Sequence, residues 1–439
     1  MVEAGSLFDV WRGKPAMNSR RKAASWGAAR AIVQMACSFV SIKLTAVYLG
    51  PSGLALIAQF NNFMILCHSV VTTGLETATS RLGAEYQADA ARRGSLLNTV
   101  GKIGLGFGLL IAMLVAVGSP WLADRLLKDS GYTWVFILGA LSIVPLILNG
   151  IFLSALSAQG EVARVVLSNI VAAVCGLLIF APASIHWGVS GGLFASSTIY
   201  FCSLLVTIAL TFRVPSFNWR DFVGRFDRSE ARRIAGFYPM LIVHAIVAPL
   251  SLIVVREHVS TSLNLESAGL WQACWRLSET YLMVVMSTVT TQFMVRLGAA
   301  INSPHRFRAE VLSTLALAVG ATAAFAVVIY IFREWVIRFI FSAAFLPVTD
   351  LLPGQLAGDV LKIAGITLGF VLVATMRSAW YISIALIVPA VFIAVARLLD
   401  GSGVQGVITA YVVSGVVHCV LSLVALRDLL PGRGGISEG

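Results

Sequence analysis

Stretches of about 20 mostly apolar residues recur along the whole chain, separated by short polar or glycine- and proline-containing connections. A helix needs about 20 such residues to cross the hydrocarbon core of a bilayer. The pattern predicts twelve spanning helices, at residues 24–48, 53–78, 96–118, 133–157, 162–182, 189–212, 231–255, 267–295, 310–332, 350–375, 378–397 and 404–426. Two short amphipathic segments, 121–128 and 333–345, are expected to lie at the membrane interface.

The composition supports this prediction and excludes a soluble fold. Hydrophobic residues make up 58% of the 439 residues, charged residues make up 12%, and the mean hydropathy is +0.86. This charged share is about half that of an average soluble domain. A transmembrane barrel would need segments of about ten residues with alternating polarity, and the chain lacks them. The predicted fold class is therefore all-α: a polytopic membrane protein of about twelve helices, in two six-helix bundles with a central cleft.

The lysines and arginines of the connections predict the orientation, because basic loops are retained in the cytoplasm. With the N-terminus inside, 20 of these residues lie on the cytoplasmic side and 6 on the opposite side. The six are Arg125, Lys128, Arg256, Arg333, Arg338 and Arg397. We therefore expect a multi-pass protein of the bacterial inner (cytoplasmic) membrane with both termini in the cytoplasm.

The densest basic stretch, 213–233, lies between the sixth and seventh predicted spans and divides them six and six. Similar tetrapeptides, Pro51-Ser-Gly-Leu54 and Ser267-Ala-Gly-Leu270, open the second and eighth spans, as expected for parallel repeats. The predicted parts are an N-terminal tail at 1–16, a bundle at 17–212, a cytoplasmic basic linker at 213–230, a bundle at 231–427 and a cytoplasmic tail at 428–439. Met17 is an alternative translation start.

Basic residues inside the predicted spans are candidates for function. Each charge costs about 2.5–3.5 kcal/mol to insert into a bilayer, so it usually faces a cavity or a partner. Arg30 and Lys43 lie in the first span, Arg256 at the outer end of the seventh and Arg276 in the eighth. Lys43 is expected to line a cavity, whereas Arg30 either does so or extends toward the cytoplasmic interface. These four cations are the candidate substrate-binding residues.

Two carboxylates lie three positions from a basic residue. Glu279 follows Arg276, and Asp359 precedes Lys362, a spacing that places each pair on one helix face. Each pair is either a structural brace or part of a site where the cation binds an anionic ligand and the carboxylate takes up a proton. We expect the Asp359–Lys362 pair to be structural, and we keep Glu279 and Asp359 as candidates for proton coupling.

Uncharged polar and aromatic residues form a third group of candidates, in the second and eighth spans. They suit either a wall that binds sugars or hydrogen bonds between helices. The candidates are Gln59, Asn62, Trp271 and Gln272, with Asn61, Thr72 and Thr73 nearby. His68 alone is expected to be a packing residue. Glu76 and Arg81 are expected to reach the cytoplasmic interface.

Motifs for catalysis and metal binding are missing from the sequence. There is no P-loop, no Gly-x-Ser-x-Gly elbow and no His-Glu-x-x-His. The six cysteines lie within apolar runs without metal-ligand spacing and are expected to pack. We expect no enzyme activity, no cofactor and no metal. The net charge of +11 comes largely from basic residues in the predicted cytoplasmic connections, where they set the orientation of the chain. No nucleic-acid partner is therefore expected.

Three stretches carry a more specific pattern: Lys43-Leu-Thr-Ala-Val-Tyr-Leu-Gly-Pro-Ser-Gly-Leu54, Gly269-Leu-Trp-Gln272 with Ser278-Glu-Thr-Tyr281, and Gln355-Leu-Ala-Gly-Asp-Val-Leu-Lys-Ile-Ala-Gly365. In these the chain resembles the Wzx-type oligosaccharide-lipid flippases, most closely the lipid III (enterobacterial common antigen) flippases. The resemblance covers nearly the whole chain from Met17. Glu279 stands where those flippases have an aspartate. The wider superfamily includes multidrug and lipid II exporters.

This resemblance implies a function in lipopolysaccharide, O-antigen or related polysaccharide biosynthesis. The cargo would be a polyprenyl-diphosphate-linked oligosaccharide that is turned from the cytoplasmic to the periplasmic leaflet of the lipid bilayer by alternating access. Arg30, Lys43, Arg256 and Arg276 would bind the diphosphate, with Lys362, Gln59, Asn62, Trp271 and Gln272 in support. A polysaccharide polymerase and a chain-length regulator are the expected protein partners. The alternatives are a multidrug/cation antiporter of the same fold and a non-transporting scaffold.

Overall fold

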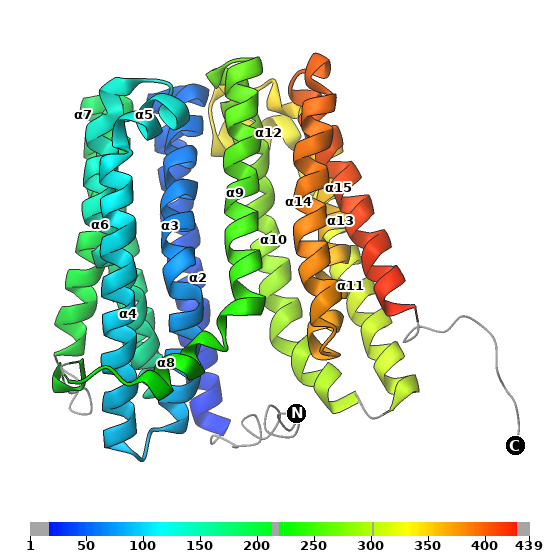
Figure 1. The fold of residues 1–439 in the computed structure, drawn as a ribbon. Helices are drawn as coiled ribbons and strands as arrows, with labels where there is room; N and C mark the ends of the chain where they lie inside the picture. The colour runs from blue at the N-terminus through cyan, green and yellow to red at the C-terminus, as the bar shows by residue number, and fades with distance from the viewer. Residues whose placement is uncertain (1–16, 213–218, 223, 301–302, 428–439) are drawn as a thin grey trace, which may run out of the picture. The chain divides into compact units, whose positions relative to one another are not determined.

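The computed structural model describes residues 17–212, 219–222, 224–300 and 303–427 as helices and short turns (Figure 1). The tails expected at 1–16 and 428–439, and residues 213–218 of the expected linker, lie outside the described residues. Contacts divide the chain into two compact units. The N-terminal unit runs to Glu257 and includes Ile340–Ser342, and the C-terminal unit comprises His258–Phe339 and the chain from Ala343. The division at 213–230 into two six-helix bundles stays a prediction.

The N-terminal unit is built from long helices that begin and end close to the predicted boundaries. They are α2 (Met17–Leu44), α3 (Gly50–Glu85), α4 (Ala90–Val117), α5 (Ser119–Leu127), α6 (Thr133–Ala158), α7 (Val162–Thr211), α8 (Arg228–Ala235) and α9 (Tyr238–Ser262), the last ending beyond Glu257. A π-helical segment, Thr45–Leu49, follows α2. Gly188 interrupts α7 with φ 57° and ψ −137°, a backbone conformation that glycine adopts without steric cost. α7 therefore contains the two helices predicted at 162–182 and 189–212.

Aromatic rings hold α3 against α6 in the core of this unit. Phe136 is fully buried and packs edge-on against Phe60 and Phe63, with ring centroids 5.7 and 5.4 Å apart. Edge-to-face pairs of this kind add about 0.5–1.5 kcal/mol to the free energy gained from burial. These contacts fix which face of α3 is turned toward α6, and with it the direction of the polar residues that α3 carries.

The C-terminal unit contains α10 (Leu265–Ala300), α11 (Pro304–Ile331), α12 (Arg333–Ile340), α13 (Val348–Ala374), α14 (Ser378–Leu398) and α15 (Val404–Leu426). α13 packs against α10, α11 and α15. Two of its glycines face α15 closely, since a Cβ on Gly358 would overlap the ring of Tyr411 and a Cβ on Gly365 would overlap that of His418. These glycines let α15 approach α13 closely, which is how small residues act in membrane helix packing.

The predicted fold class is confirmed. Among the described residues, nine helical segments are long and apolar enough to cross a membrane. One of them, Arg30–Glu85, contains α2 and α3, and another, Val162–Thr211, contains the two helices of α7. α10 is not among these nine segments, and it lies where the eighth span was predicted, at 267–295. With α10, these helices account for all twelve predicted spans.

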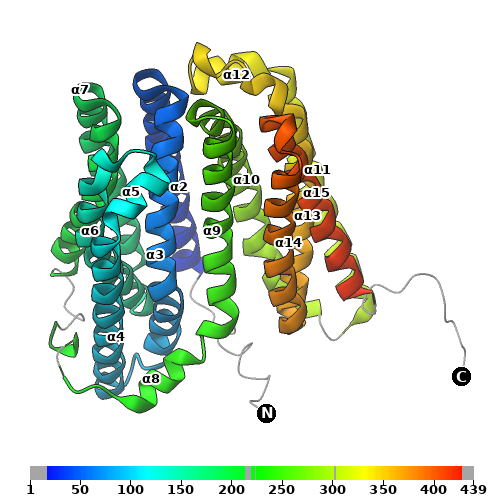
Figure 2. The ribbon, with the colours of Figure 1, turned by 45° about the horizontal axis from the view of Figure 1, so that its top comes forward.

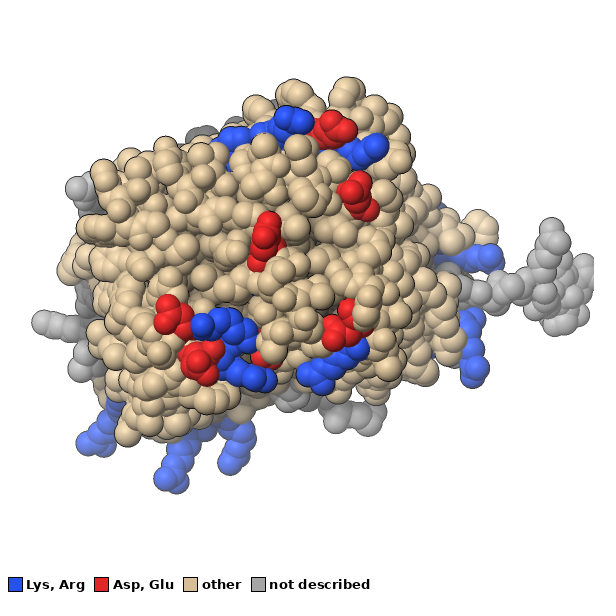
Figure 3. Space-filling model, turned by 90° about the horizontal axis from the view of Figure 1, so that it is seen from above, with Lys and Arg blue, Asp and Glu red and all other residues tan. Residues whose placement is uncertain are grey.

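Short helices form at the two predicted interfacial segments, as α5 and α12. Glu257, near the end of α9, accepts from Arg125 and Lys128 of the α5 region, each at 3.3 Å. Two of the six basic residues expected outside are therefore paired with a carboxylate. On the face shown in Figure 3, most residues are uncharged, and basic and acidic side chains occur in small mixed groups.

The span predicted at 231–255 begins too early, and the structure corrects it. Its first residues belong to α8, a short charged helix that precedes α9 (Figures 1 and 2). Asp227 caps α8 by accepting from the backbone N–H of Ser229 at 2.8 Å and of Glu230 at 3.4 Å. Asp227 also accepts from the hydroxyl of Ser95 in α4, at 2.9 Å. α8 starts at this N-cap and ends at Ala235, with Gly236 as its C-cap, so α9 begins only at Tyr238.

A further contact joins α8 to the end of α3. Glu230 is buried and accepts from the hydroxyl of Tyr86 at 3.3 Å, and Arg233 donates to the same hydroxyl. Burial, together with the charge of Glu230, raises the pKa of Tyr86 above its usual value. The phenol therefore stays neutral and donates its proton to the carboxylate. Hydrogen bonds therefore attach the α8 region to the end of α3 through Tyr86 and to α4 through Ser95.

Asp227 predicts a measurable pH dependence of this attachment. The hydrogen bonds from Ser229 and Ser95 lower the pKa of Asp227 from 3.8 to about 2. Because the folded pKa is depressed, the attachment has its full stability above about pH 4 and loses it as the pH falls toward 2. We expect pepsin cleavage near α8 in the detergent-purified protein to accelerate across this range. Asp227→Asn keeps an acceptor oxygen at the N-cap but has no titrating carboxylate, so its attachment should not weaken as the pH falls. The exposed Asp124→Asn should follow the wild-type profile, and a wild-type profile for Asp227→Asn would contradict the assignment.

Candidate functional site

Asp359 lies at the centre of a hydroxyl cage in the C-terminal unit. Its side chain is fully buried in α13. Ser278 and Tyr281 of α10 both donate to Oδ2 at 2.6 Å, and Tyr411 of α15 donates to Oδ1 at 2.7 Å. Gln355, one turn earlier in α13, donates to the Ser278 hydroxyl at 2.9 Å. Three O–H donors at this distance are typical of charge-assisted bonds to a carboxylate.

Lys362 lies one turn after Asp359 and interacts with aromatic rings. Its ammonium is 4.3 Å from the ring centroid of Trp275 and 5.7 Å from that of Tyr411. Among the ion pairs of the described residues, Lys362 and Asp359 do not form the direct pair that their spacing predicts. The hydroxyl cage occupies the carboxylate, and the ring faces attract the cation by their quadrupoles. Tyr411 therefore contacts both charged groups, one through its hydroxyl and the other through its ring.

Arg276 and Glu279 do form the predicted pair, with Nη1 to Oε2 at 3.3 Å. Glu279 also accepts from the indole N–H of Trp275 at 2.8 Å. About 40% of each charged side chain is exposed, so this pair is open to a ligand. Trp271 and Gln272, one turn earlier, are buried, and Trp271 packs against Trp275 with centroids 5.8 Å apart.

Arg256 belongs to the N-terminal unit and forms a buried polar cluster with α3. Its side chain is only 1% exposed, and its Nη1 donates to Gln59 Oε1 at 2.8 Å. With its amide oxygen turned toward the guanidinium, Asn62 accepts from Nη1 at 3.0 Å and from Nη2 at 3.3 Å. Gln59 also donates to the backbone carbonyl of Ile253 at 3.1 Å. In this conformation Arg256 joins α3 to α9.

This cluster predicts a stability effect. Arg256→Met leaves the buried amide oxygen of Gln59 and the half-buried one of Asn62 without their donor, which costs roughly 2–4 kcal/mol of folding free energy. We expect a clear fall in the thermal unfolding temperature of the detergent-purified protein. The matched control is Arg397→Met, which replaces an exposed arginine on the same predicted side of the membrane. Equal stability of the two variants would contradict the buried cluster.

The two cations of the first predicted span have separate surroundings. Arg30 is half-buried, and its Nε donates to Gln34 in the next turn of α2 at 3.2 Å. Lys43 is also half-buried, and its Nζ donates to the backbone carbonyl of Phe341 at 2.5 Å. Lys43 therefore attaches the segment Ile340–Ser342 to the N-terminal unit.

The structure thus brings together two groups of the candidates. Arg256, Gln59 and Asn62 form one group. Arg276 and Glu279 of α10 join Asp359 and Lys362 of α13 in the other, because Trp275 contacts both Glu279 and Lys362. Sequence reasoning missed Ser278, Tyr281, Trp275 and Tyr411 as members of the second group. Ser278 and Tyr281 share a helix face at i,i+3, a spacing that could have suggested a common acceptor. Tyr411 carries no such local signal.

Together, the helical spans, the buried charges and the paired charges define a multi-pass membrane protein of the transporter type. The chain belongs to the polysaccharide biosynthesis protein family, whose profile matches residues 21–295. It is 22% identical over 401 residues to the lipid III flippases of Escherichia coli (strain K12) and Shigella flexneri, which covers 91% of this chain and 96% of each relative.

Solved structures show the same fold. The lipid II flippase MurJ in an inward closed conformation matches with a TM-score of 0.73 at 15% identity, over 92% of this chain and 87% of that one. A multidrug resistance MATE family transporter in an inward-facing conformation matches with a TM-score of 0.72 at 15% identity, over 91% of this chain and 98% of that one. The fold is therefore shared by lipid and drug transporters.

Proposed function

We propose that this protein is a flippase that moves a polyprenyl-diphosphate-linked oligosaccharide, of the lipid III or O-antigen repeat-unit type, from the cytoplasmic to the periplasmic leaflet by alternating access. The observation that carries the proposal is the similarity to lipid III flippases over 91% of this chain and 96% of their length. The cargo crosses the membrane without chemical change. The bias of basic residues supports an inner-membrane location with both termini in the cytoplasm.

A diphosphate with about two negative charges cannot cross about 30 Å of hydrocarbon without compensating cations. Arg276 is the best placed of the four candidates, because its side chain is 40% exposed and its partner Glu279 is equally exposed. Arg30 is half-buried and hydrogen-bonds a neutral glutamine, so its charge is also available. Lys43 and Arg256 already bind protein oxygens. They reach the cargo only in another conformation of the transport cycle.

The energy for this step has two candidate sources. Outward movement of an anion is favoured by an inside-negative potential at about 2.3 kcal/mol per charge per 100 mV, so two charges gain roughly 4–5 kcal/mol. Protonation of Glu279 or Asp359 would couple the return step to a proton gradient. The cage around Asp359 supports this role, because loss of the charge would change the acceptor of three hydroxyls at once.

Complementation tests the proposed cargo class. In a bacterial strain that lacks its own lipid III flippase, expression of this chain should restore surface polysaccharide. The chain is expressed with a fluorescent tag so that its presence in the membrane can be checked. If the tagged chain reaches the membrane but restores no surface polysaccharide, the proposal is contradicted. A polysaccharide polymerase and a chain-length regulator remain proposed partners, and crosslinking in the complemented strain would identify them.

A cation antiporter is the second candidate, favoured by the similarity to MATE transporters and by the buried carboxylate of Asp359. Such a transporter binds cationic drugs and needs acidic groups in its cavity. The charges inside the predicted spans are instead weighted toward arginine and lysine. Increased resistance to cationic dyes in cells that express the chain, without polysaccharide at the surface, would favour this alternative.

A further inference from the structure

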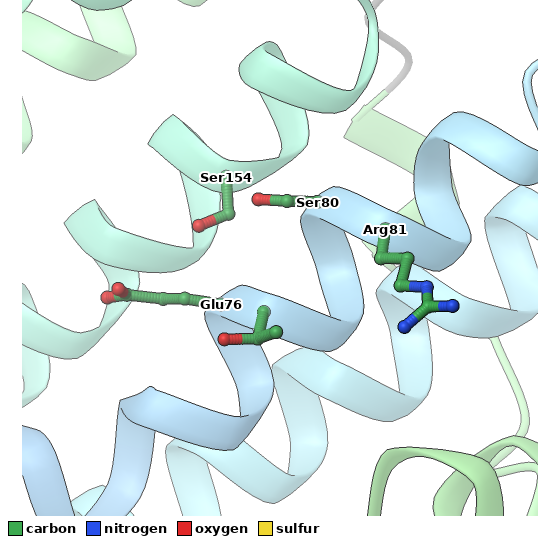
Figure 4. Close-up of a pocket in the computed structure, with 5 residues that line it drawn as sticks. Glu76, Ser80, Arg81 and Ser154 are labelled. Atoms are coloured by element: carbon green, nitrogen blue, oxygen red, sulfur yellow. The ribbon is translucent and has the colours of Figure 1, made fainter. Parts of the chain in front are cut away.

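A polar pocket opens between α3 and α6 of the N-terminal unit. It has a volume of about 490 Å³ and is lined by Glu76, Thr77, Ser80 and Arg81 of α3 and Ser154 of α6 (Figure 4). The pocket is wide open on one side, so it would contact one face of a ligand rather than enclose it. All five lining side chains are polar. None of them belongs to the candidate site described above.

Glu76 is held in position across the helix interface. Its Oε1 lies 3.3 Å from Nε2 of His68, two turns earlier in α3. The His68 ring also lies within hydrogen-bond distance of the Thr72 hydroxyl. On the α6 side, a Cβ at Gly150 would overlap the Glu76 carboxylate and contact His68. Gly150 therefore makes the space that the carboxylate occupies, and His68 is a partner of Glu76 rather than a packing residue alone.

Hydroxyl groups of the pocket are available to a ligand. Ser80 of α3 extends toward Ser154 of α6, whose hydroxyl is turned away from Ser80 (Figure 4). Among the described residues, neither hydroxyl has a hydrogen-bond partner, and Ser154 is only 8% exposed. The Ser154 hydroxyl is nevertheless not among the described polar atoms that are fully enclosed without a partner, so a ligand can reach it. A ligand that both donates and accepts hydrogen bonds would satisfy these groups.

We propose that this α3–α6 pocket binds a sugar ring of the lipid-linked cargo through the hydroxyls of that ring. The carboxylate of Glu76 would accept from sugar hydroxyls, while Ser80 and Ser154 would donate to sugar oxygens. This inference rests on the proposed function and adds a carbohydrate subsite to it. Glu76 lies nine residues, or about 13 Å, before the end of α3. In the predicted orientation that end is cytoplasmic, where the cargo enters.

The charges of the pocket favour a neutral sugar over a phosphate. Glu76 would repel an anion, and the guanidinium of Arg81 lies over the ring of Phe237, 5.8 Å from its centroid. The pocket therefore combines one acceptor group, several hydroxyls and one cation next to an aromatic ring. Carbohydrate hydroxyls require such a mixture of acceptors and donors.

Binding of two polyprenyl diphosphates to the purified full-length protein tests the inference. One probe carries a single N-acetylglucosamine, the other carries no sugar, and native mass spectrometry gives the ratio of their affinities. We expect wild type to prefer the sugar-bearing probe at least fivefold, and Glu76→Gln and Ser154→Ala each to bring the ratio close to one. Glu85→Gln replaces an exposed glutamate of the same helix outside the pocket and should keep the wild-type ratio.

The outcomes separate this subsite from the proposed function. If wild type binds both probes equally, or if both pocket variants keep its preference, the subsite is wrong while the flippase proposal stands. If wild type binds neither probe, both proposals fail. Unfolding temperatures near that of wild type show that the variants are folded, and Ser154→Ala gives an independent result where Glu76→Gln does not fold.

Discussion

Asp359→Asn is expected to reduce leaflet transfer at least about tenfold while the protein still inserts into the membrane, a change of about 1.4 kcal/mol in the activation free energy. Asparagine keeps the volume of the side chain but offers one acceptor oxygen in place of two. At least one of the hydroxyls of Ser278, Tyr281 and Tyr411 then loses its acceptor, and Lys362 loses the neighbouring negative charge. The measurement is the initial rate of transfer in vesicles at several values of the proton gradient.

The control for this variant is Asp350→Asn, which replaces an exposed aspartate in the first turn of the same helix. It should transport at the wild-type rate. Glu279→Gln is measured in parallel, because either carboxylate could carry the proton. If Asp359→Asn and Glu279→Gln both keep the wild-type rate and its proton dependence, proton coupling at these residues is wrong.

Arg276→Gln should weaken transport roughly 10–100-fold, because a hydrogen bond to a charged group contributes about 1.5–3 kcal/mol. Arginine binds phosphate with two parallel donors, so Arg276→Lys should restore only part of the activity. The Arg276→Gln variant also leaves Glu279 without its guanidinium partner, so an unpaired negative charge lies where the cargo diphosphate is expected. Surface polysaccharide in the complemented flippase-deficient strain is the measurement.

The matched control is Arg296→Gln, which replaces another exposed arginine of α10, paired with Glu310 at 3.6 Å. It should complement like wild type. Lys43→Gln should also reduce transport, since Lys43 binds the Phe341 carbonyl in one conformation and is proposed to reach the cargo in another. Wild-type complementation by both Arg276→Gln and Lys43→Gln, with normal amounts in the membrane, would remove the basis for the cation proposal.

The helices could be predicted because each membrane span requires about 20 mostly apolar residues in a row, which the sequence shows directly. Even the break within α7 was visible, since polar and glycine residues near Gly188 interrupt the apolar run. The start of α9 could not be predicted in this way. Arg232 and Arg233 directly precede an apolar run, and the structure shows that they belong to α8, which ends at the C-cap Gly236.

The site was predictable only where its members share one helix. The spacing of Arg276 and Glu279 predicted their ion pair correctly. The same spacing failed for Asp359 and Lys362, because Tyr411 lies 52 residues beyond Asp359 and supplies both a hydroxyl and an aromatic face. The burial of Arg256 was likewise invisible, because its acceptors Gln59 and Asn62 lie nearly 200 residues earlier. Contacts over such distances depend on tertiary packing, which local patterns do not encode.

Reconstitution of the purified protein with a fluorescent polyprenyl-diphosphate oligosaccharide tests the central claim most directly. The fraction of the lipid that a membrane-impermeant quencher reaches is followed over time, with and without an imposed membrane potential. The flippase proposal predicts protein-dependent transfer between leaflets that an inside-negative potential accelerates in the outward direction. No transfer of the lipid, together with proton flux driven by cationic drugs, would contradict it.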